Sequence, residues 1–359
     1  MPNQAKLLIA ASGTGGHLFP AIATAEQLSQ VEIEWLGVPD RLETRLVPDC
    51  YPLHTIAVEG FQQRFGLSTL RIFGRLVHSI WQVRQLLQRG QFQGVFTTGG
   101  YIAAPAILAA RSLGLPAILH ESNAFPGKVT RLLSPFCNTV ALGFEAAADR
   151  LPKAQTQWVG TPVRSPFLQP VADLPALSLP VPDNVPLIVV VGGSQGAVAV
   201  NQLVRQSAPV WLEQGAWIVH LTGDNDPNTK ELVHPQYLAL PFFENMAGLL
   251  RRATLAVSRS GAGTLTELAI ARLPSILIPY PYAADDHQTF NAQVFAAAGA
   301  AHLYQQADLT ADILQHQVSE LLQHPERLQQ MAEAASQLAI ADSAQQLAIV
   351  IERSLLLRS

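Results

Sequence analysis

The sequence predicts an α/β fold with two tandem Rossmann-like domains that face each other across a cleft. The chain has 359 residues, a length typical of about two domains. Apolar segments of strand length alternate with helical patterns, as in parallel sheets covered by helices. A strand followed by a glycine-rich turn occurs twice, at residues 6–17 and 187–197. Ligands of such sheets bind beyond the carboxyl ends of the strands, so two facing domains would share one site.

The candidate strands are short apolar runs that end in glycine or polar residues. They are residues 6–11, 95–98, 117–120, 139–142, 187–191, 217–221, 255–258 and 275–279. Seven prolines between positions 162 and 186 indicate an extended linker. We therefore expect a first domain over 1–162, a second over 163–342, and a C-terminal helix of about 343–359 that packs back on the first domain.

The composition suits a globular protein with large cores, since 48% of the residues are hydrophobic and 14% are charged. No apolar run approaches the ~18–20 residues of a membrane-spanning helix. A strand begins within the first six residues, which leaves no room for a signal peptide. Cys50 and Cys137 lack CxxC spacing and fit reduced thiols. We expect a cytoplasmic protein.

The charge is distributed unevenly. Residues 1–160 hold 13 Lys and Arg against 10 Asp and Glu, whereas residues 161–359 hold 10 against 17. A positive first half can approach an anionic surface. Chance scatter accounts for the difference equally well.

The first glycine turn, residues 13–17, lies between a strand and a helix expected from Phe19 onward. Backbone amides at a helix N-terminus bind anions, so this turn suits a phosphate. The third position of a dinucleotide-binding G-x-G-x-x-G is Leu18, although Glu34 supplies an acid, so that motif is half met. The plain alternative is a tight turn that binds nothing.

His17 adds chemistry to this turn, because the adjoining helix N-terminus favours a neutral imidazole that can act as a base. The alternative is a solvated loop histidine. No G-x-x-x-x-G-K-[ST] motif is present, which argues against a P-loop ATPase or kinase.

Three segments of the second half carry polar groups. Residues 192–197 form the second glycine turn, and residues 258–267 place Gly261, Gly263 and Thr264 where their amides can meet a diphosphate. Glu267 can reach sugar hydroxyls or cap the helix. Gln288 and Asn291 share one helix face, and their amides suit a sugar. We expect no metal site at residues 285–287, because adjacent side chains rarely converge on one ion.

In the first half, residues 99–102 and 120–123 each follow a strand and are expected at the ligand edge of the sheet. Residues 68–89 have the pattern of an amphipathic helix. Its basic stripe and large apolar residues, which include Arg71, Phe73, Arg75 and Trp81, suit docking on a membrane surface. An ordinary outer helix with its apolar side in the core has the same pattern.

Together these motifs resemble the bacterial undecaprenyldiphospho-muramoylpentapeptide β-N-acetylglucosaminyltransferases. The resemblance spans nearly the whole chain and rests on an ordered set of segments: 13–17, 99–101, 120–123, 160–164, 192–197, 259–267 and 285–292. It implies a GT-B fold and an inverting transfer that needs no metal ion and no cofactor. The acceptor hydroxyl attacks the anomeric carbon, UDP leaves, and a general base takes the proton.

The resemblance also implies roles for particular residues. The catalytic residues would be His17, as the base, and Glu267, which would read the ribose. Donor contacts would come from Thr14, Gly15, Gly16, Asn123, Arg164, Ser194, Phe243, Gly261, Ala262, Gly263, Thr264, Gln288 and Asn291. Acceptor contacts would come from Gly13, Arg64, Gly100 and Tyr101. The chain departs from the family at Ser12, usually glycine, and at residues 61–66, where a Leu-Arg-Gly-like loop is common.

The expected function is transfer of N-acetylglucosamine from UDP-N-acetylglucosamine to the muramoyl 4-hydroxyl of lipid I, which makes lipid II for peptidoglycan. The expected partners are the donor, the undecaprenyl-linked acceptor and the anionic inner leaflet, without nucleic acid. The protein would be peripheral on the cytoplasmic face of the plasma membrane. The alternatives are a related GT-B glycolipid glycosyltransferase, a UDP-N-acetylglucosamine epimerase and a non-catalytic nucleotide-sugar-binding protein. The missing third glycine disfavours an NAD-dependent oxidoreductase.

Overall fold

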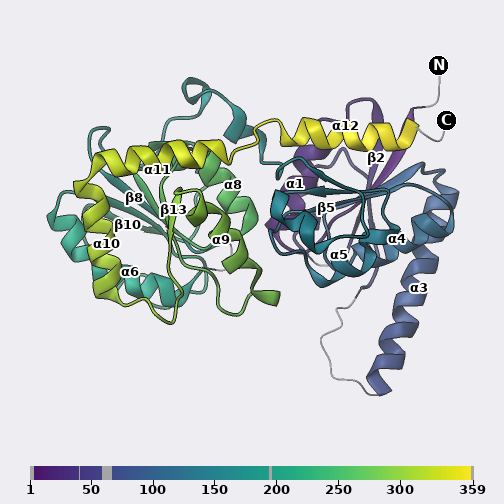
Figure 1. Cartoon of the computed structure of the whole chain (residues 1–359), viewed down its shortest axis with the longest axis horizontal. Coiled ribbons are helices and arrows are strands. Elements are labelled where there is room, and N and C mark those ends of the chain that lie inside the picture. The colour runs from purple at the N-terminus through teal and green to yellow at the C-terminus, as the bar shows by residue number, and fades with distance from the viewer. Residues whose placement is uncertain (1–3, 40, 59–66, 194–195, 357–359) are drawn as a thin grey trace. The chain divides into compact units, whose positions relative to one another are not determined.

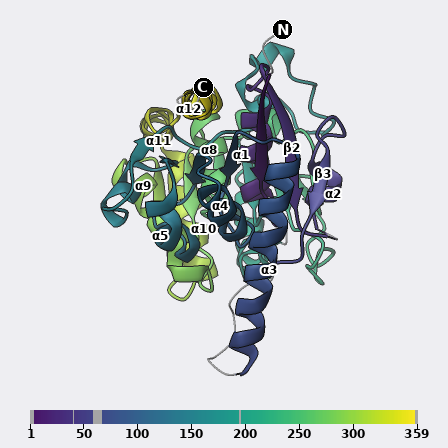
Figure 2. The same ribbon diagram turned by 90° about the vertical axis from the view of Figure 1, so that its right-hand side faces the viewer.

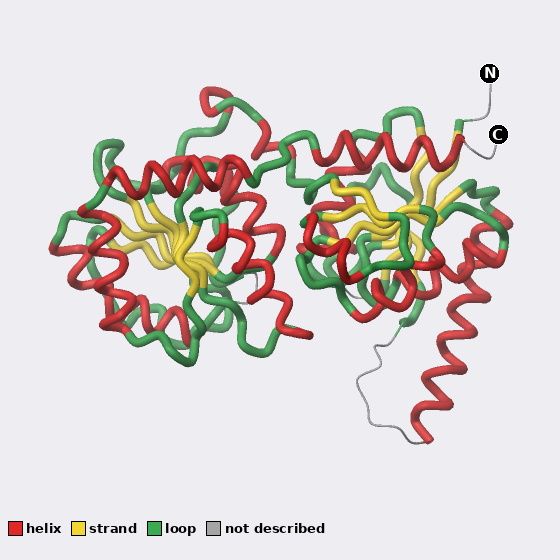
Figure 3. Tube along the Cα trace, viewed as in Figure 1, coloured by secondary structure: helices red, strands yellow, loops and turns green. Residues whose placement is uncertain are grey.

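A computed structural model describes residues 4–39, 41–58, 67–193 and 196–356, with the backbone alone described for 67–73. The chain divides into two compact units, and each is an α/β unit in which helices surround a parallel sheet (Figures 1 and 3). Unit 1 comprises residues 1–164 and 341–359, and unit 2 comprises residues 165–340.

The sheet of unit 1 has seven parallel strands in the order β3-β2-β1-β4-β5-β6-β7. The strands are β1 (Ala5–Ala10), β2 (Val31–Gly37), β3 (Leu53–Thr55), β4 (Gly94–Thr97), β5 (Ala117–Glu121), β6 (Thr139–Leu142) and β7 (Thr156–Trp158). The strand order reverses between β1 and β4, which makes the turns after these strands the expected ligand edge. Residues 13–17 and 99–101 are those turns.

Helices cover both faces of this sheet. They are α1 (Gly15–Ala25), α2 (Glu43–Leu46), α3 (Leu67–Arg89), α4 (Ala103–Ser112), α5 (Lys128–Leu133) and α12 (Ser343–Leu356), with short 3-10 helices η1 (Ser134–Phe136) and η2 (Glu145–Arg150). Side chains alternate across β1: Leu8 packs with α3 and α4, whereas Ile9 packs with α1 and α12. Figures 1 and 2 show α3 extending past the other helices of its unit.

The last helix, α12, returns to unit 1 although more than 170 residues of unit 2 precede it. Leu347 and Ile351 are fully buried against Leu18 and Ala21 of α1, and they join the core on that face of the sheet. Burial of these apolar side chains stabilises the packing of α12 on α1.

Unit 2 has six parallel strands in the order β10-β9-β8-β11-β12-β13. They are β8 (Leu187–Val191), β9 (Trp217–Leu221), β10 (Tyr237–Leu240), β11 (Leu255–Ser258), β12 (Ser275–Leu277) and β13 (Ala301–Leu303). Its helices are α6 (Val198–Glu213), α7 (Met246–Arg252), α8 (Ala262–Ile270), α9 (His287–Ala297), α10 (Ala311–Gln323) and α11 (Pro325–Gln337), with 3-10 helices η3 (Ser165–Leu168), η4 (Val171–Asp173) and η5 (Ala284–Asp286). The order reverses between β8 and β11, so the turns that follow these two strands lie at the ligand edge.

The expectation of α/β units with parallel sheets is confirmed. The structure adds five strands to the eight candidates: β2, β3, β7, β10 and β13. It also starts α1 at Gly15 rather than near Phe19, so His17 lies on the first helical turn and not in a loop. None of the helices in the described part of the chain is long and apolar enough to cross a membrane.

Candidate active site

The turn after β1 is shaped by glycine. Gly13 has φ +104°, and a side chain on Gly15 would meet the Phe19 ring at 2.7 Å. Thr14 is the extended N-cap of α1, and its carbonyl accepts from the amides of His17 (3.0 Å) and Leu18 (3.2 Å). The amides that begin a helix have no partner within it, so the start of α1 presents donors for an anion.

His17 connects this turn to the one after β4. Its Nδ1 lies 2.7 Å from the carbonyl oxygen of Thr98, and the Thr98 hydroxyl donates to the His17 carbonyl at 3.0 Å. A carbonyl can only accept, so Nδ1 carries the proton, and Nε2 of the neutral ring carries the lone pair. The imidazole is therefore oriented as a base through Nε2.

The glycines at 99 and 100 lie beside this ring. Both have positive φ, +92° and +74°. A Cβ on Gly99 would lie 3.6 Å from the His17 Cε1, and a Cβ on Gly100 would lie 3.7 Å from Nε2. The next residue, Tyr101, is 42% exposed. Three of the predicted site residues, His17, Gly100 and Tyr101, thus lie together at the switch point of unit 1.

A buried carboxylate that the sequence analysis missed supports the first glycine turn. Glu43 on α2 is fully buried and accepts from the amides of Gly13 (3.2 Å) and Val38 (2.7 Å). Burial alone would raise the pKa of Glu43, but hydrogen bonds from Ser12 and these amides outweigh it and lower the pKa below 4.5. No sequence signal links Glu43 to the first glycine turn, because Gly13 lies 30 residues earlier in the chain.

Glu121 organises the segment that follows β5. Its carboxylate accepts from the Asn123 amide and side chain (both 3.0 Å), the Gly127 amide (3.0 Å) and the Thr130 hydroxyl (2.6 Å). His120 is fully buried, which lowers its pKa, and its Nε2 lies 2.8 Å from the Gly160 carbonyl. Of this segment, Asn123 is more accessible than the buried His120 and Glu121.

Arg164 ends the first part of unit 1. Its guanidinium lies 4.7 Å from the ring centroid of Phe19, the side chain that packs beside Gly15. The fold thus brings this predicted donor contact to the helix that carries His17. Arg64 and Ser194 lie outside the described residues, as do the side chains of Arg71 and Phe73.

The turn after β11 gathers several predicted residues of unit 2. Gly261 is the extended N-cap of α8, which begins at Ala262. Among the described residues, apart from chain neighbours and the backbone of α8 itself, no atom lies within 4 Å of where a Cβ on Gly261 or Gly263 would stand, so both positions border open space. Thr264 and Glu267 follow on α8 and are half-buried.

Gln288 and Asn291, the residues predicted to contact the sugar, are hydrogen-bonded to Ser260 beside this turn. Gln288 Oε1 accepts from the amides of Ser260 (3.3 Å) and Tyr280 (3.0 Å), and Asn291 donates to the Ser260 carbonyl (3.1 Å). Asn291 is fully buried. These bonds fix the turn at the start of α8, while direct contact with a sugar stays a prediction. Phe243 is half-buried in the loop between β10 and α7.

The glycine turn after β8 rests on a buried polar network. Gly196 has φ +76°, and a Cβ there would collide with the Thr222 carbonyl. Asn201 donates to that carbonyl (2.9 Å) and to Asp226 (2.7 Å), which pairs with the buried Arg205 (2.7 Å). This ion pair is the second support that the sequence analysis missed.

His220 completes the network. Its Nε2 lies 3.0 Å from Asn201 Oδ1, an acceptor, and its Nδ1 lies 2.6 Å from the Tyr237 hydroxyl. A neutral ring that donates through Nε2 and accepts at Nδ1 satisfies both partners. Burial, followed by the nearby Arg205 charge, lowers the pKa of His220 to about 3, in agreement with a neutral ring.

Residues 285–287 are used in local structure. Asp285 and Asp286 have φ of +52° and +53°, Asp286 accepts from the Thr289 hydroxyl (2.7 Å), and His287 Nδ1 lies 2.8 Å from the Ala284 carbonyl. Within the described residues, no group of three or more His, Cys, Asp or Glu side chains is arranged to hold a metal ion.

Two doubly wound units, each with glycine turns at its switch point, define a two-domain α/β protein of the nucleotide-binding class. Residues 7–142 match the glycosyltransferase family 28 N-terminal domain, and residues 187–347 match the C-terminal domain of that family. The chain belongs to glycosyltransferase family 28 and is a glycosyltransferase.

Two relatives with high sequence identity carry the same name. The chain is 64% identical over 346 residues to the UDP-N-acetylglucosamine–N-acetylmuramyl-(pentapeptide) pyrophosphoryl-undecaprenol N-acetylglucosamine transferase of Nostoc punctiforme, covering 96% of this chain and 97% of the relative. It is 65% identical over 348 residues to the Rippkaea orientalis protein of the same name, covering 97% and 98%.

Solved structures share the fold. MurG of Acinetobacter baumannii superimposes with a TM-score of 0.78 at 30% identity, covering 98% of this chain and 99% of that one. A UDP-GlcNAc 2-epimerase from Neisseria meningitidis, bound to UDP-GlcNAc, has a TM-score of 0.69 at 14% identity, covering 97% and 100%. The second likeness shows the fold alone.

Replacing Glu43 by Gln tests the support of the first glycine turn. The folded-state pKa is lowered, so the ionised carboxylate stabilises the fold above about pH 4.5, and this contribution is lost as the pH falls through the folded-state pKa. We expect Glu43→Gln to lose about 1–3 kcal/mol in urea unfolding at pH 7, because an amide NH₂ would face a backbone N–H. The difference from the unsubstituted protein should shrink below pH 4.5.

The matched control is Glu213→Gln at the exposed end of α6. An equal loss of stability in both variants would contradict the assignment.

Proposed function

We propose that the chain transfers N-acetylglucosamine from UDP-N-acetylglucosamine to the muramoyl 4-hydroxyl of undecaprenyl-diphospho-muramoylpentapeptide, converting lipid I to lipid II in peptidoglycan synthesis. Relatives at 64–65% identity over nearly the full length carry the name of this activity. The observation that carries the proposal is the orientation of His17, whose Nδ1 donates to Thr98 and leaves a lone pair on Nε2 beside Gly100.

The proposed reaction is an inverting displacement. The acceptor hydroxyl oxygen forms a bond to the anomeric carbon of the donor sugar, the bond from that carbon to the diphosphate breaks, and Nε2 of His17 takes the hydroxyl proton. General base catalysis contributes about 10²–10⁴ in rate. Fixing the proton on Nδ1 in advance spares the ring a change of tautomer during the reaction.

The leaving diphosphate needs stabilised negative charge. In unit 2 we assign this to the amides of Gly261, Ala262, Gly263 and Thr264, where the N-terminus of α8 adds its dipole. These donors support a transfer without a metal ion. Ser194 would meet the same diphosphate, Phe243 the uracil, Glu267 the ribose, and Gln288 and Asn291 the sugar.

Unit 1 would hold the acceptor. The amides that begin α1 and the turn at Gly100 suit its diphosphate. Tyr101 and Arg64 would add contacts there. Thr14, Gly15, Gly16, Asn123 and Arg164 would complete the donor contacts.

The proposal predicts when UDP is released. With UDP-N-acetylglucosamine and a lipid I analogue, UDP release should require the acceptor and persist in EDTA, since backbone amides replace a metal. The assay is continuous measurement of UDP with and without each component. UDP release without the acceptor would indicate hydrolysis of the donor. Binding of the donor without UDP release would indicate a binding protein. Loss of UDP release in EDTA would refute the proposal that the transfer needs no metal ion.

His17→Ala should lower kcat by about 10²–10⁴ and leave the affinity for UDP-N-acetylglucosamine unchanged, because the variant loses the base but no proposed donor contact. Steady-state kinetics and calorimetry measure the two quantities. His316→Ala, on the exposed face of α10, is the matched control. Near-full turnover of His17→Ala would remove the assignment.

We further propose that α3 docks unit 1 on the anionic inner leaflet, which would make the enzyme peripheral on the cytoplasmic face. Trp81 is 53% exposed and stacks on His78 with ring centroids 5.9 Å apart, and Arg75 lies exposed on the same helix. An exposed indole on a helix that also carries basic side chains is typical of interfacial helices.

Co-sedimentation with vesicles tests this docking. Binding to the vesicles should rise with the fraction of anionic lipid. It should fall about tenfold in an Arg75→Gln/Trp81→Ala variant, because the variant loses one positive charge and one indole that would be buried in the membrane. Trp158→Ala, an exposed tryptophan on β7, is the control. Binding that ignores anionic lipid content would exclude the surface.

A further inference from the structure

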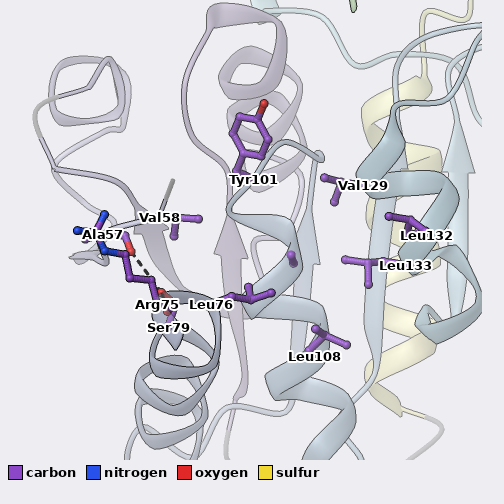
Figure 4. A pocket seen from close by; sticks show the side chains of 11 residues that line it. Ala57, Val58, Arg75, Leu76, Ser79, Tyr101, Leu108, Val129, Leu132 and Leu133 are labelled. Atoms are coloured by element: carbon purple, nitrogen blue, oxygen red, sulfur yellow. Dashed lines mark hydrogen bonds between the residues drawn. The ribbon is translucent and has the colours of Figure 1, made fainter. Parts of the chain in front are cut away.

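A cavity of about 180 Å³ opens between α3, α4 and α5 of unit 1 (Figure 4). Its apolar lining includes Leu76, Leu108, Val129, Leu132 and Leu133. Leu132 is 73% exposed, so the cavity opens to solvent on the α5 side. Apolar cavities of roughly 150 Å³ bind a six-carbon ring. The space therefore suits about one branched five-carbon unit.

The polar groups of the lining do not make it a site for a polar ligand. The Ser79 hydroxyl is buried, and its oxygen lies 2.9 Å from the Arg75 carbonyl and 3.2 Å from the Ala57 carbonyl. The Ser79 hydroxyl thus donates its proton to a backbone carbonyl of the protein itself. Figure 4 shows the Arg75 side chain reaching past Ala57, away from the leucines. The cavity is apolar inside and has a cation at its rim.

The position of the cavity relates it to the catalytic turn. Tyr101, in the turn before α4, lines the cavity together with Ala104 and Leu108, which lie about one turn apart on α4. Tyr101 directly follows Gly100, which borders Nε2 of His17. A molecule whose anionic group lies at the start of α4 would therefore extend along this helix into the cavity.

We propose that this cavity binds the isoprenyl unit of the acceptor that is nearest to its diphosphate, an inference that rests on the proposed function. The acceptor has the required order of groups: a sugar hydroxyl for His17, a diphosphate for the glycine turns, and a branched apolar chain. The cavity and the surface proposed for docking share Arg75 but otherwise use different residues of α3: Val77 and Trp81 are exposed, whereas Leu76 and Ser79 line the cavity.

The test uses two water-soluble acceptors that share the muramoyl-pentapeptide diphosphate, one with a ten-carbon geranyl chain and one with a methyl group. Assays contain no vesicles and no detergent. The unsubstituted enzyme should prefer the geranyl acceptor about tenfold in kcat/KM, a fraction of what full burial of five carbons provides. Leu108→Trp, which fills the cavity, should reduce this preference, the ratio of the two kcat/KM values, to about one.

Val77→Trp, one position from Leu76 but exposed, is the control and should keep the preference. Val129→Phe fills the cavity from α5 and replaces Leu108→Trp if that variant does not fold. A preference that survives filling, or that falls equally in Val77→Trp, would overturn the proposal.

A binding measurement separates this inference from the proposed function. Geranyl diphosphate should bind the unsubstituted protein at least about tenfold more tightly than inorganic diphosphate by calorimetry, and Leu108→Trp should abolish the difference. If neither acceptor is glycosylated but this difference is seen, the cavity stands and the function fails. If both acceptors react equally well and the two diphosphates bind alike, the function stands and the cavity assignment fails.

Discussion

The hydrogen bond from His17 Nδ1 to the Thr98 carbonyl is the contact on which the arrangement of the first unit's site depends. It joins the two turns at the switch point of the sheet, and it also determines which nitrogen of the imidazole is available. The bond is possible only because β1 and β4 are parallel neighbours, which brings their carboxyl ends to one edge. The turn beside the ring has positive φ at Gly99 and Gly100, a backbone conformation that favours glycine.

Buried charged or amide groups support three of the segments that follow the strands. Glu43 accepts from the turn after β1, Glu121 organises the segment after β5, and Asn201 with Asp226 supports the turn after β8. A buried carboxylate is costly unless its oxygens are hydrogen-bonded, so each carboxylate fixes the backbone amides or side chains that satisfy it. The glycines give the turns their shape, and these groups hold that shape in place.

The two faces of the sheet in unit 1 differ in how completely they are packed. The face covered by α1 and α12 is closed by apolar side chains such as Leu347 and Ile351. On the other face, α3 and α4 pack on the sheet but leave an apolar space toward α5. A close-packed core would fill such a space, because voids forfeit dispersion contacts. This apolar space lies beside the turn that contains Gly100. For that reason we propose it as the binding site for the apolar chain of the acceptor.

Strand periodicity and glycine turns are local patterns, so the sequence by itself determined the α/β class, the order of the motifs and the family. It missed β3, β7 and β13, which have three residues each and little pattern to recognise. It also placed His17 before the helix, because it took Pro20 as the first turn. Only the tertiary structure decided the imidazole tautomer and the support from Glu43. The reason is separation along the chain: His17 and Thr98 are 81 residues apart, and Gly13 and Glu43 are 30 apart, so folding alone brings them into contact.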